Sequence, residues 1–298
     1  STKEEDIIKE FSNLREPDPN LLEAAKARAY ADWIYGINYT VLFSLKTGVT
    51  TPIGRVKLPT LKLLVDRYKE VTNFKPEKYY QLNAFIEKDN KLIKFTLEDK
   101  YKDKLKIEEL KSTLDNDEYG FVKEIEKKTE RELAPSFYSL SKLQSDANDA
   151  YGYTLSQTLD IVQKLYDKSY VTYPRTDSDV VPVSEEANLK NRIEYIPDAF
   201  KAYKDKAINN IHSGIKLSKK YVKDTSSAHF AIVVNNAAED LTKEEQNIYD
   251  LICKSMLAPF LGAALWDNSK VTLDIGNMCF VAKGKVLKEQ GFRELIPV

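Results

Sequence analysis

The order of the predicted elements indicates an α+β chain of several domains, in which a β domain is interrupted by a helical insert. Alternating apolar and polar residues predict strands within 79–133, helical periodicity follows over 139–261, and strand patterns return over 270–296. The later strands need partners for their edges, and the earlier ones are available. A chain of 298 residues is long enough for two or three domains. The expected boundaries are 1–73 for a helical segment, 74–133 with 265–298 for the β domain, and 134–264 for the helical insert.

The first segment is predicted to hold two helices. Asn20 is placed to cap a helix, because Glu23 follows at the spacing of a capping box, and this helix should run towards Gly48. A second helix should begin near Pro59, a residue that suits a first turn. Its apolar face would be formed by Leu61, Leu64, Val65, Tyr68 and Val71.

The β domain and its insert follow from changes of period. Strands are expected at 79–86 and 92–97, joined by a hairpin at 88–90, and at 119–133, where the charge density also permits a helix. Thr154 and Thr242 have capping-box spacing to Gln157 and Glu245. The expected helices are 139–150, 154–167, 184–195, 197–209 and 242–261, and the later strands are 270–275, 278–282 and 290–296.

Composition indicates an ordinary soluble protein. Charged residues make up 31% and hydrophobic residues 42%, and no run approaches the ~20 apolar residues of a membrane span. The chain opens at Ser1 without an export signal, and its two cysteines form neither a disulfide framework nor a zinc knuckle. We therefore expect a cytoplasmic protein without a membrane partner.

Charge is unevenly distributed along the chain. The net charge of −1 counts against a simple nucleic-acid binder, for which a basic domain is typical. Between Lys26 and Lys75, however, nine Lys or Arg stand against three acids, a local balance of +6. Such a stretch fits a groove that follows a phosphate backbone, and it fits a solvated helix face as well.

The segment 173–178, with the sequence YPRTDS, combines a nucleophile with a phosphate-binding group. A free tyrosine phenol titrates near pH ~10, but a phosphotyrosine preserves the energy of a phosphodiester and makes cleavage reversible. Arg175 supplies a planar fork that matches phosphate oxygens. Residues 168–172 predict a short strand that delivers Tyr173 to a loop. The alternative is an ordinary turn, since the chain has 18 tyrosines.

Other polar residues also allow two interpretations. Arg28, Asp32, Tyr35 and Tyr39 share one helix face, which suits phosphate binding and base stacking or an ordinary ion pair beside half-buried tyrosines. His229, at the entry to an apolar run, is either a structural residue or part of a site. The acidic run 115–118 has oxygen ligands for Mg²⁺, but we interpret it as a solvated turn.

Several segments together resemble type IA DNA topoisomerases. The segment YPRTDS resembles the active-site segment of that family, and the Pro after Tyr173 is similar to its topoisomerase III branch. Collinear resemblances run from about Asn20 to the end of the chain, with departures at Lys57, where Gln is usual, and at Val234-Asn235, where Pro-Thr is usual. The other matching segments are 25–38 (AKARAYADWIYGIN), 54–61 (GRVKLPTL), 141–144 (SKLQ), 228–232 (AHFAI) and 291–295 (GFREL).

The resemblance implies a fold and a reaction. The β domain would form an arch that carries the helical domain with Tyr173, and Tyr173 would cleave single-stranded DNA through a 5′-phosphotyrosyl link that is resealed without ATP. Arg175 and His229 would contact the scissile phosphate. The implied DNA-binding residues are Arg28, Asp32, Tyr35, Arg55, Lys57, Gln144, Thr176, Asp177 and Ser178.

The resemblance also implies partners outside this sequence. The family carries Mg²⁺ on acidic residues of a TOPRIM domain, which we do not find here, so we expect a central fragment that binds no metal and is incomplete alone. Its partners would be single-stranded DNA and the TOPRIM domain of its parent chain, in the cytoplasm at the nucleoid. The alternatives are a non-catalytic single-strand-binding module, which would bind strands without a covalent adduct, and a helical protein-interaction domain with an incidental YPRT.

Overall fold

The computed structural model describes residues 8, 11–14, 16–114, 119–224 and 229–297. Contacts divide the chain into two compact units, one containing Gln81–Asp99 and Glu108–Val298 and the other Glu10–Tyr80 and Lys100–Ile107. The acidic run 115–118 lies outside the described residues. The three domain boundaries expected from the sequence remain a prediction.

The Glu10–Tyr80 unit is built on two helices, α2 (Pro19–Thr47) and α3 (Lys57–Thr72). The expectation that Asn20 caps α2 is wrong: the Asp18 carboxylate caps it, accepting the N–H groups of Asn20 and Leu21. A carboxylate satisfies the free N–H groups of a first turn, and Pro19 needs no such acceptor. The helix ends at Gly48, whose φ of 72° is the left-handed conformation of a C-cap.

The connection between α2 and α3 is tied to α2 by hydroxyl groups. Thr40 Oγ1 accepts the Ile53 N–H at 2.9 Å, and Ser44 Oγ accepts the Thr51 N–H at 2.9 Å. Both helices are accessible to solvent, because none of the residues of α2 or α3, all of which are described, is buried.

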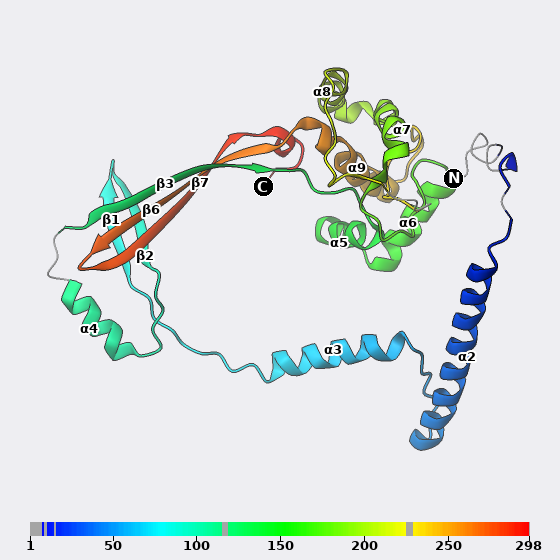
Figure 1. Ribbon diagram of the computed structural model, residues 1–298, viewed down its shortest axis with the longest axis horizontal. Helices are drawn as coiled ribbons and strands as arrows, with labels where there is room; N and C mark the ends of the chain where they lie inside the picture. The colour runs from blue at the N-terminus through cyan, green and yellow to red at the C-terminus, as the bar shows by residue number, and fades with distance from the viewer. Residues whose placement is uncertain (1–7, 9–10, 15, 115–118, 225–228, 298) are drawn as a thin grey trace. The chain divides into compact units, whose positions relative to one another are not determined.

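The Gln81–Asp99 and Glu108–Val298 unit contains an antiparallel sheet formed from two distant parts of the sequence. Its strands are β1 (Asn83–Lys88), β2 (Lys91–Leu97), β3 (Phe121–Glu132), β6 (Ala264–Ile275) and β7 (Met278–Glu289), in the order β1-β2-β7-β6-β3. The pairs Thr96↔Val281 and Leu97↔Phe280 join the early hairpin to the late one. The α+β fold with a discontinuous β domain is therefore confirmed, and β3, β6 and β7 form a long ribbon (Figure 1).

The turns of the sheet explain where its strands reverse. Asp89 and Asn90 have φ values of 51° and 58°, and Gly276 and Asn277 have 56° and 61°. Two successive left-handed residues make the type of turn whose twist suits a tight hairpin. One helix that the sequence analysis did not include, α4 (Lys104–Leu114), precedes β3.

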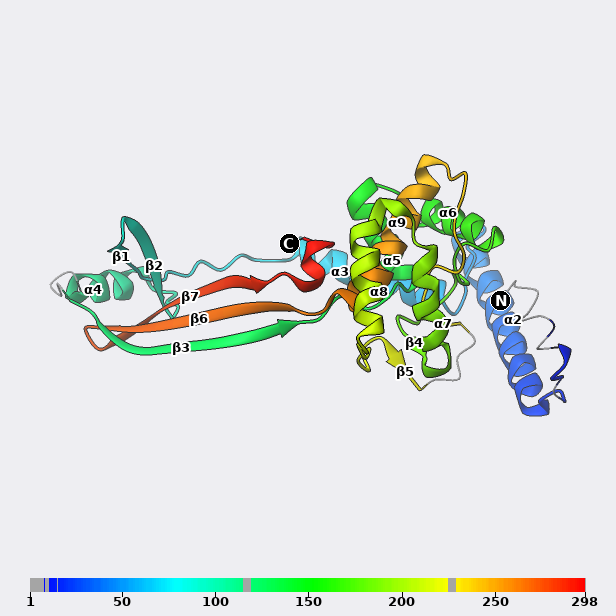
Figure 2. The ribbon, with the colours of Figure 1, turned by 90° about the horizontal axis from the view of Figure 1, so that it is seen from above.

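A helical domain interrupts the sheet between β3 and β6 (Figure 2). This domain contains most of the buried hydrophobic core. Capping boxes begin two of its helices, as expected: Thr154 with Gln157 and Thr242 with Glu245. The helices are α5 (Leu140–Tyr151), α6 (Leu155–Asp167), α7 (Glu186–Asn191), α8 (Lys201–His212) and α9 (Lys243–Leu257). Short 3-10 turns are η1 (Val183–Glu185), η2 (Arg192–Tyr195), η3 (Asp198–Phe200) and η4 (Ala258–Leu261), and β4 (Val181–Pro182) pairs in parallel with β5 (Val222–Lys223).

The strand expected over 290–296 is wrong, because the chain forms the 3-10 turn η5 (Gly291–Glu294). Gly291 has φ 49°, and the Phe292 side chain is 1% exposed while its N–H donates to Gly262 O at 3.0 Å. Arg293 forms an ion pair with Glu132, and Glu132 also accepts the Trp266 indole N–H at 2.7 Å. Residues 291–294 therefore pack against the end of the ribbon at Glu132 and Trp266, which we call the root of the ribbon, and do not pair as a strand.

In the described part of the chain, no helix is long and apolar enough to cross a membrane.

Candidate active site

Tyr173 lies on a loop that the helical domain holds by backbone hydrogen bonds. The predicted strand at 168–172 is wrong: Ser169 has φ 62°, and only an isolated bridge joins Val171 to Val234. Next to that bridge, the Thr172 N–H donates to Val233 O at 3.0 Å, and the Thr172 hydroxyl donates to Ala231 O at 2.8 Å. The loop is therefore fixed one residue before the tyrosine.

The segment that receives these bonds runs through the core. Ala231, Ile232, Val233 and Val234 are all 0% exposed. Ile232 N–H donates to Tyr138 O at 2.8 Å, and Ala231 N–H donates to Val180 O at 3.0 Å. Burial makes each of these bonds costly to leave unmade, so the segment is a rigid support for the tyrosine loop.

The Tyr173 ring is half-buried between two other rings. Its centroid lies 4.7 Å from that of His229, with 37° between the planes. On α6, Tyr166 lies 5.4 Å away at 76°, an edge-to-face arrangement. The structure therefore brings together Tyr173 and His229, two residues that the sequence analysis assigned to one site.

Thr176 holds the backbone of the two loops that carry Tyr173 and His229. Its side chain is buried, 5% exposed, and its hydroxyl donates to His229 O at 2.8 Å and accepts the Ser178 N–H at 3.1 Å. Its own carbonyl accepts the Leu140 N–H at 3.0 Å, at the start of α5. Thr176 thus fixes the backbone at His229, and the DNA contact predicted for Thr176 stays a prediction.

Arg175 and Asp177 are exposed on the same loop, and Ser178 is half-buried. With the other described residues, Arg175 makes no ion pair or side-chain hydrogen bond, so its guanidinium is available to an anion. The Ser178 hydroxyl donates to Val180 O at 3.1 Å. Gln144, another predicted DNA contact, donates to Leu155 O at 2.8 Å and so links α5 to α6.

The remaining predicted DNA-binding residues lie in the Glu10–Tyr80 unit. Asp32 and Arg55 form a two-bonded ion pair, in which Arg55 Nη2 donates to Asp32 Oδ2 at 3.1 Å. The Arg55 guanidinium lowers the pKa of Asp32, with a smaller contribution from Arg28, and Asp32 raises the pKa of Arg55. Arg28 and Lys57 are exposed, and the Tyr35 ring lies 4.6 Å from that of Tyr39.

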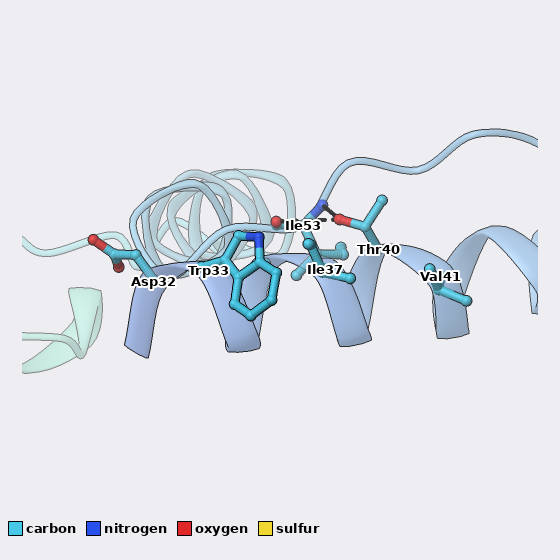
Figure 3. Close-up of a pocket in the computed structure, with 7 residues that line it drawn as sticks. Asp32, Trp33, Ile37, Thr40, Val41 and Ile53 are labelled. Atoms are coloured by element: carbon cyan, nitrogen blue, oxygen red, sulfur yellow. Dashed lines mark hydrogen bonds between the residues drawn. The ribbon is translucent and has the colours of Figure 1, made fainter. Parts of the chain in front are cut away.

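Two shallow hollows lie along α2. One, of about 420 Å³, is lined by Asp32, Trp33, Gly36, Ile37, Thr40, Val41 and Ile53 (Figure 3). The other, of about 510 Å³, is lined by Ala31, Ile34, Tyr35, Asn38, Tyr39 and Leu42. The Arg55–Asp32 pair lies at the first and the tyrosine pair at the second, so each hollow combines apolar walls with a polar or aromatic end.

Comparison with known proteins identifies the family. A family model described as DNA topoisomerase matches residues 16–298. The chain belongs to the DNA topoisomerase family. It is 33% identical over 301 residues to DNA topoisomerase 3 of Bacillus licheniformis, covering 95% of this chain and 40% of that protein. It is 35% identical over 289 residues to DNA topoisomerase 3 of Bacillus subtilis, covering 92% of this chain and 38% of that protein.

A solved structure supports the fold. Full-length topoisomerase I from Thermotoga maritima matches with a TM-score of 0.70 and 24% identity, over 98% of this chain and 48% of that chain. The type IA topoisomerase assignment made from the motifs is confirmed. The chain spans about two fifths of the length of the topoisomerase 3 relatives.

Two features of this candidate site were not predicted from the sequence. Tyr166 was not singled out, although it lies in the last turn of α6 in an edge-to-face contact with the Tyr173 ring. Lys168 and Glu245 were not paired, yet Lys168 Nζ lies 2.9 and 3.0 Å from the two oxygens of the buried Glu245 carboxylate. The Thr242 N–H and Lys168 hold the pKa of Glu245 below its ordinary value. No periodic signal marks either feature, because both depend on which helices pack together.

Within the described residues, no group of three His, Cys, Asp or Glu side chains is placed to hold a metal ion. The described residues therefore offer no site for the Mg²⁺ that the family resemblance places on a TOPRIM domain.

Proposed function

We propose that this chain is the strand-cleaving and gate-forming part of a type IA DNA topoisomerase. Tyr173 Oη attacks a phosphodiester of single-stranded DNA, so that a Tyr–O–P bond forms and the P–O3′ bond breaks. The tyrosine proton is released, and the 3′ oxygen leaves as a hydroxyl after taking up a proton. The reverse attack by that hydroxyl reseals the strand without ATP.

The observation that carries this proposal is the contact between Tyr173 and His229. The Tyr173 and His229 rings are 4.7 Å apart, and Thr176 and Thr172 tie the two loops together. His229 donates a hydrogen bond to the scissile phosphate, and Arg175 neutralises charge that develops on it. A preorganised pair of this kind favours phosphoryl transfer because the groups need little rearrangement at the moment of reaction.

The strand itself is proposed to follow the basic face of the Glu10–Tyr80 unit. Arg28, Arg55 and Lys57 contact phosphates, Asp32 orients Arg55, and Tyr35 offers a ring to a base. Contacts to the backbone carry no direct sequence information, so the preference for sequence is weak. Gln144, Asp177 and Ser178 are proposed to contact the strand near Tyr173, and Thr176 acts there by fixing His229.

Magnesium and a TOPRIM domain complete the proposed enzyme. The metal is bound by acidic residues of that domain and not by this chain. Strand passage through the arch, and the proposed cytoplasmic location at the nucleoid, belong to the complete protein.

A covalent-trapping experiment tests the nucleophile. An end-labelled single-stranded oligonucleotide and Mg²⁺ are mixed with this chain and a separately supplied TOPRIM domain, then denatured and resolved on a gel. We expect a labelled protein band that Tyr173→Phe abolishes and that Tyr195→Phe, a control on η2, retains. Binding of the oligonucleotide should survive in both variants. A band that persists in Tyr173→Phe rules the assignment out, and strand binding without any band in the wild type favours the non-catalytic binding module.

A further inference from the structure

We propose that Tyr166 is a positioning residue, which holds the Tyr173 ring so that its hydroxyl faces the scissile phosphate in one orientation. The inference rests on the proposed function, because it assigns Tyr166 a role through the nucleophile. It starts from the edge-to-face contact of the two rings, at 5.4 Å and 76°.

Tyr166 is itself held firmly. Its neighbour Leu165 is 0% exposed, and α6 starts with a complete capping box. After the helix, the Ser169 N–H donates to Tyr166 O at 2.7 Å, and the Tyr170 N–H donates to Leu165 O at 2.9 Å. The last turn of α6 is therefore closed by the loop that leads to Tyr173, and the Tyr166 backbone has little freedom.

An ion pair fixes the same turn against a second helix. Lys168 Nζ binds both carboxylate oxygens of Glu245, whose side chain is 5% exposed at the start of α9. A buried carboxylate that loses its partner is costly, so the pair resists separation. The wall that Tyr166 presents to Tyr173 is thus anchored in the core through α6 and α9.

Tyr173 is consequently confined on two sides. Tyr166 presents an edge-to-face contact, whereas His229 lies at 37° and is the group expected to act on the phosphate. Aromatic pairs of this geometry prefer one orientation, and a fixed nucleophile has less entropy to lose on reaching the attack geometry. Removal of the Tyr166 ring should therefore lower the rate of adduct formation without weakening strand binding.

The test compares Tyr166→Phe, which keeps the ring, with Tyr166→Leu, which removes it. Tyr151→Leu is the matched control, because Tyr151 also pairs with a ring, that of Tyr153 at 5.5 Å, in the same helical domain. A 3-fluorotyrosine placed at position 173 of this chain reports ring order by ¹⁹F NMR. Adduct formation with the supplied TOPRIM domain gives the rate, and oligonucleotide binding gives the Kd.

We expect one sharp ¹⁹F line for the wild type, Tyr166→Phe and Tyr151→Leu, and a broadened or split line for Tyr166→Leu. The adduct rate should fall roughly two- to tenfold in Tyr166→Leu alone, the range that an aromatic pair predicts, with the Kd unchanged. If Tyr166→Leu does not fold, Tyr166→Met takes its place, because Met fills irregular gaps without an aromatic ring.

Each other outcome decides against one claim. An unchanged ¹⁹F line in Tyr166→Leu overturns the positioning role, and so does an equal loss of rate and affinity, which indicates a merely structural defect. A broadened or split line with an unchanged adduct rate shows that the order of the Tyr173 ring does not limit cleavage. This outcome also overturns the positioning role of Tyr166. An absent adduct in the wild type overturns the proposed function, while the ¹⁹F comparison still decides whether Tyr166 orders Tyr173.

Discussion

Helices α2 and α9 use apolar residues in opposite ways. In α9, eight residues of the 15-residue helix are buried, whereas none of the 29 residues of α2 is buried, although Trp33, Ile34 and Leu42 lie along it. Apolar contacts of α9 therefore contribute to the folding of its own domain. The apolar residues of α2 are exposed. Substitutions there should therefore change the contacts that α2 makes and have little effect on the stability of the fold.

The largest difference in the free energy of unfolding is expected between substitutions of two phenylalanines. Phe137 is 1% exposed and lies beside the Tyr221 ring. Its substitution by alanine should lower the free energy of unfolding of the protein by about 3–5 kcal/mol, because it leaves a cavity. Phe43, on α2 and 38% exposed, should change it by less than about 1 kcal/mol. Urea unfolding followed by circular dichroism measures both. Equal losses would mean that α2 is as well packed as the helical domain, and the contrast would fail.

Much of the fold was predictable because period-two and capping patterns are local. The helices capped by Thr154 and Thr242 begin at the predicted residues. By contrast, β6 and β7 run well beyond the predicted strands 270–275 and 278–282. Much of their added length has no clear apolar alternation, because the ribbon is largely solvent-accessible and pairing with neighbouring strands holds it. Helix α4, with Ile107 as its buried residue, gives an equally weak signal.

The site shows the same limit at the level of single residues. Tyr173 and His229 were assigned to one site through the family resemblance, since nothing local places a histidine 56 residues away beside a tyrosine. Tyr166 is one of 18 tyrosines, and only the packing of α6 distinguishes it. The segment 290–296 looked like a strand, yet Phe292 docks in the core and turns the chain. Tertiary contacts decide each of these cases.

Two glycines with a left-handed backbone conformation differ in the space that a Cβ atom would find. Gly48, at the end of α2, has φ 72° and open space where a Cβ would stand, so Gly48→Ala should cost about 1–2 kcal/mol from backbone conformation alone. At Gly291, φ is 49° and a Cβ would clash with the carbonyl group of Ala263. Gly291→Ala should cost about 2–5 kcal/mol, because overpacking adds to the same conformational cost.

Thermal or urea unfolding of the two glycine variants checks this order. A shift for Gly291→Ala no larger than that for Gly48→Ala would show that η5 moves freely away from Ala263. The docked turn at the root of the ribbon would then contribute little to the stability of the helical domain.

The smallest difference in the free energy of unfolding is expected between substitutions in two Arg–carboxylate pairs. Glu132 is bound by Arg293 and by the Trp266 indole, with 33% of its side chain exposed, whereas Asp32 and Arg55 are 44% and 43% exposed. Allowing for that exposure, Glu132→Gln should cost about 1 kcal/mol at pH 7, and Asp32→Asn should cost less and respond more to salt. Urea unfolding at low and high salt measures both.

The pH dependence of the Glu132 pair has a definite sign. The hydrogen bond from Arg293 lowers the pKa of Glu132 below its ordinary value of 4.5, so the unfolded chain binds this proton more readily than the folded chain. The stabilisation is complete above 4.5 and is lost as the pH falls from there through the lowered folded value. The difference between wild type and Glu132→Gln should accordingly be constant near neutral pH and shrink below pH 4.5. A difference that grows in acid would mean that the Arg293 pair does not stabilise the charged carboxylate of Glu132.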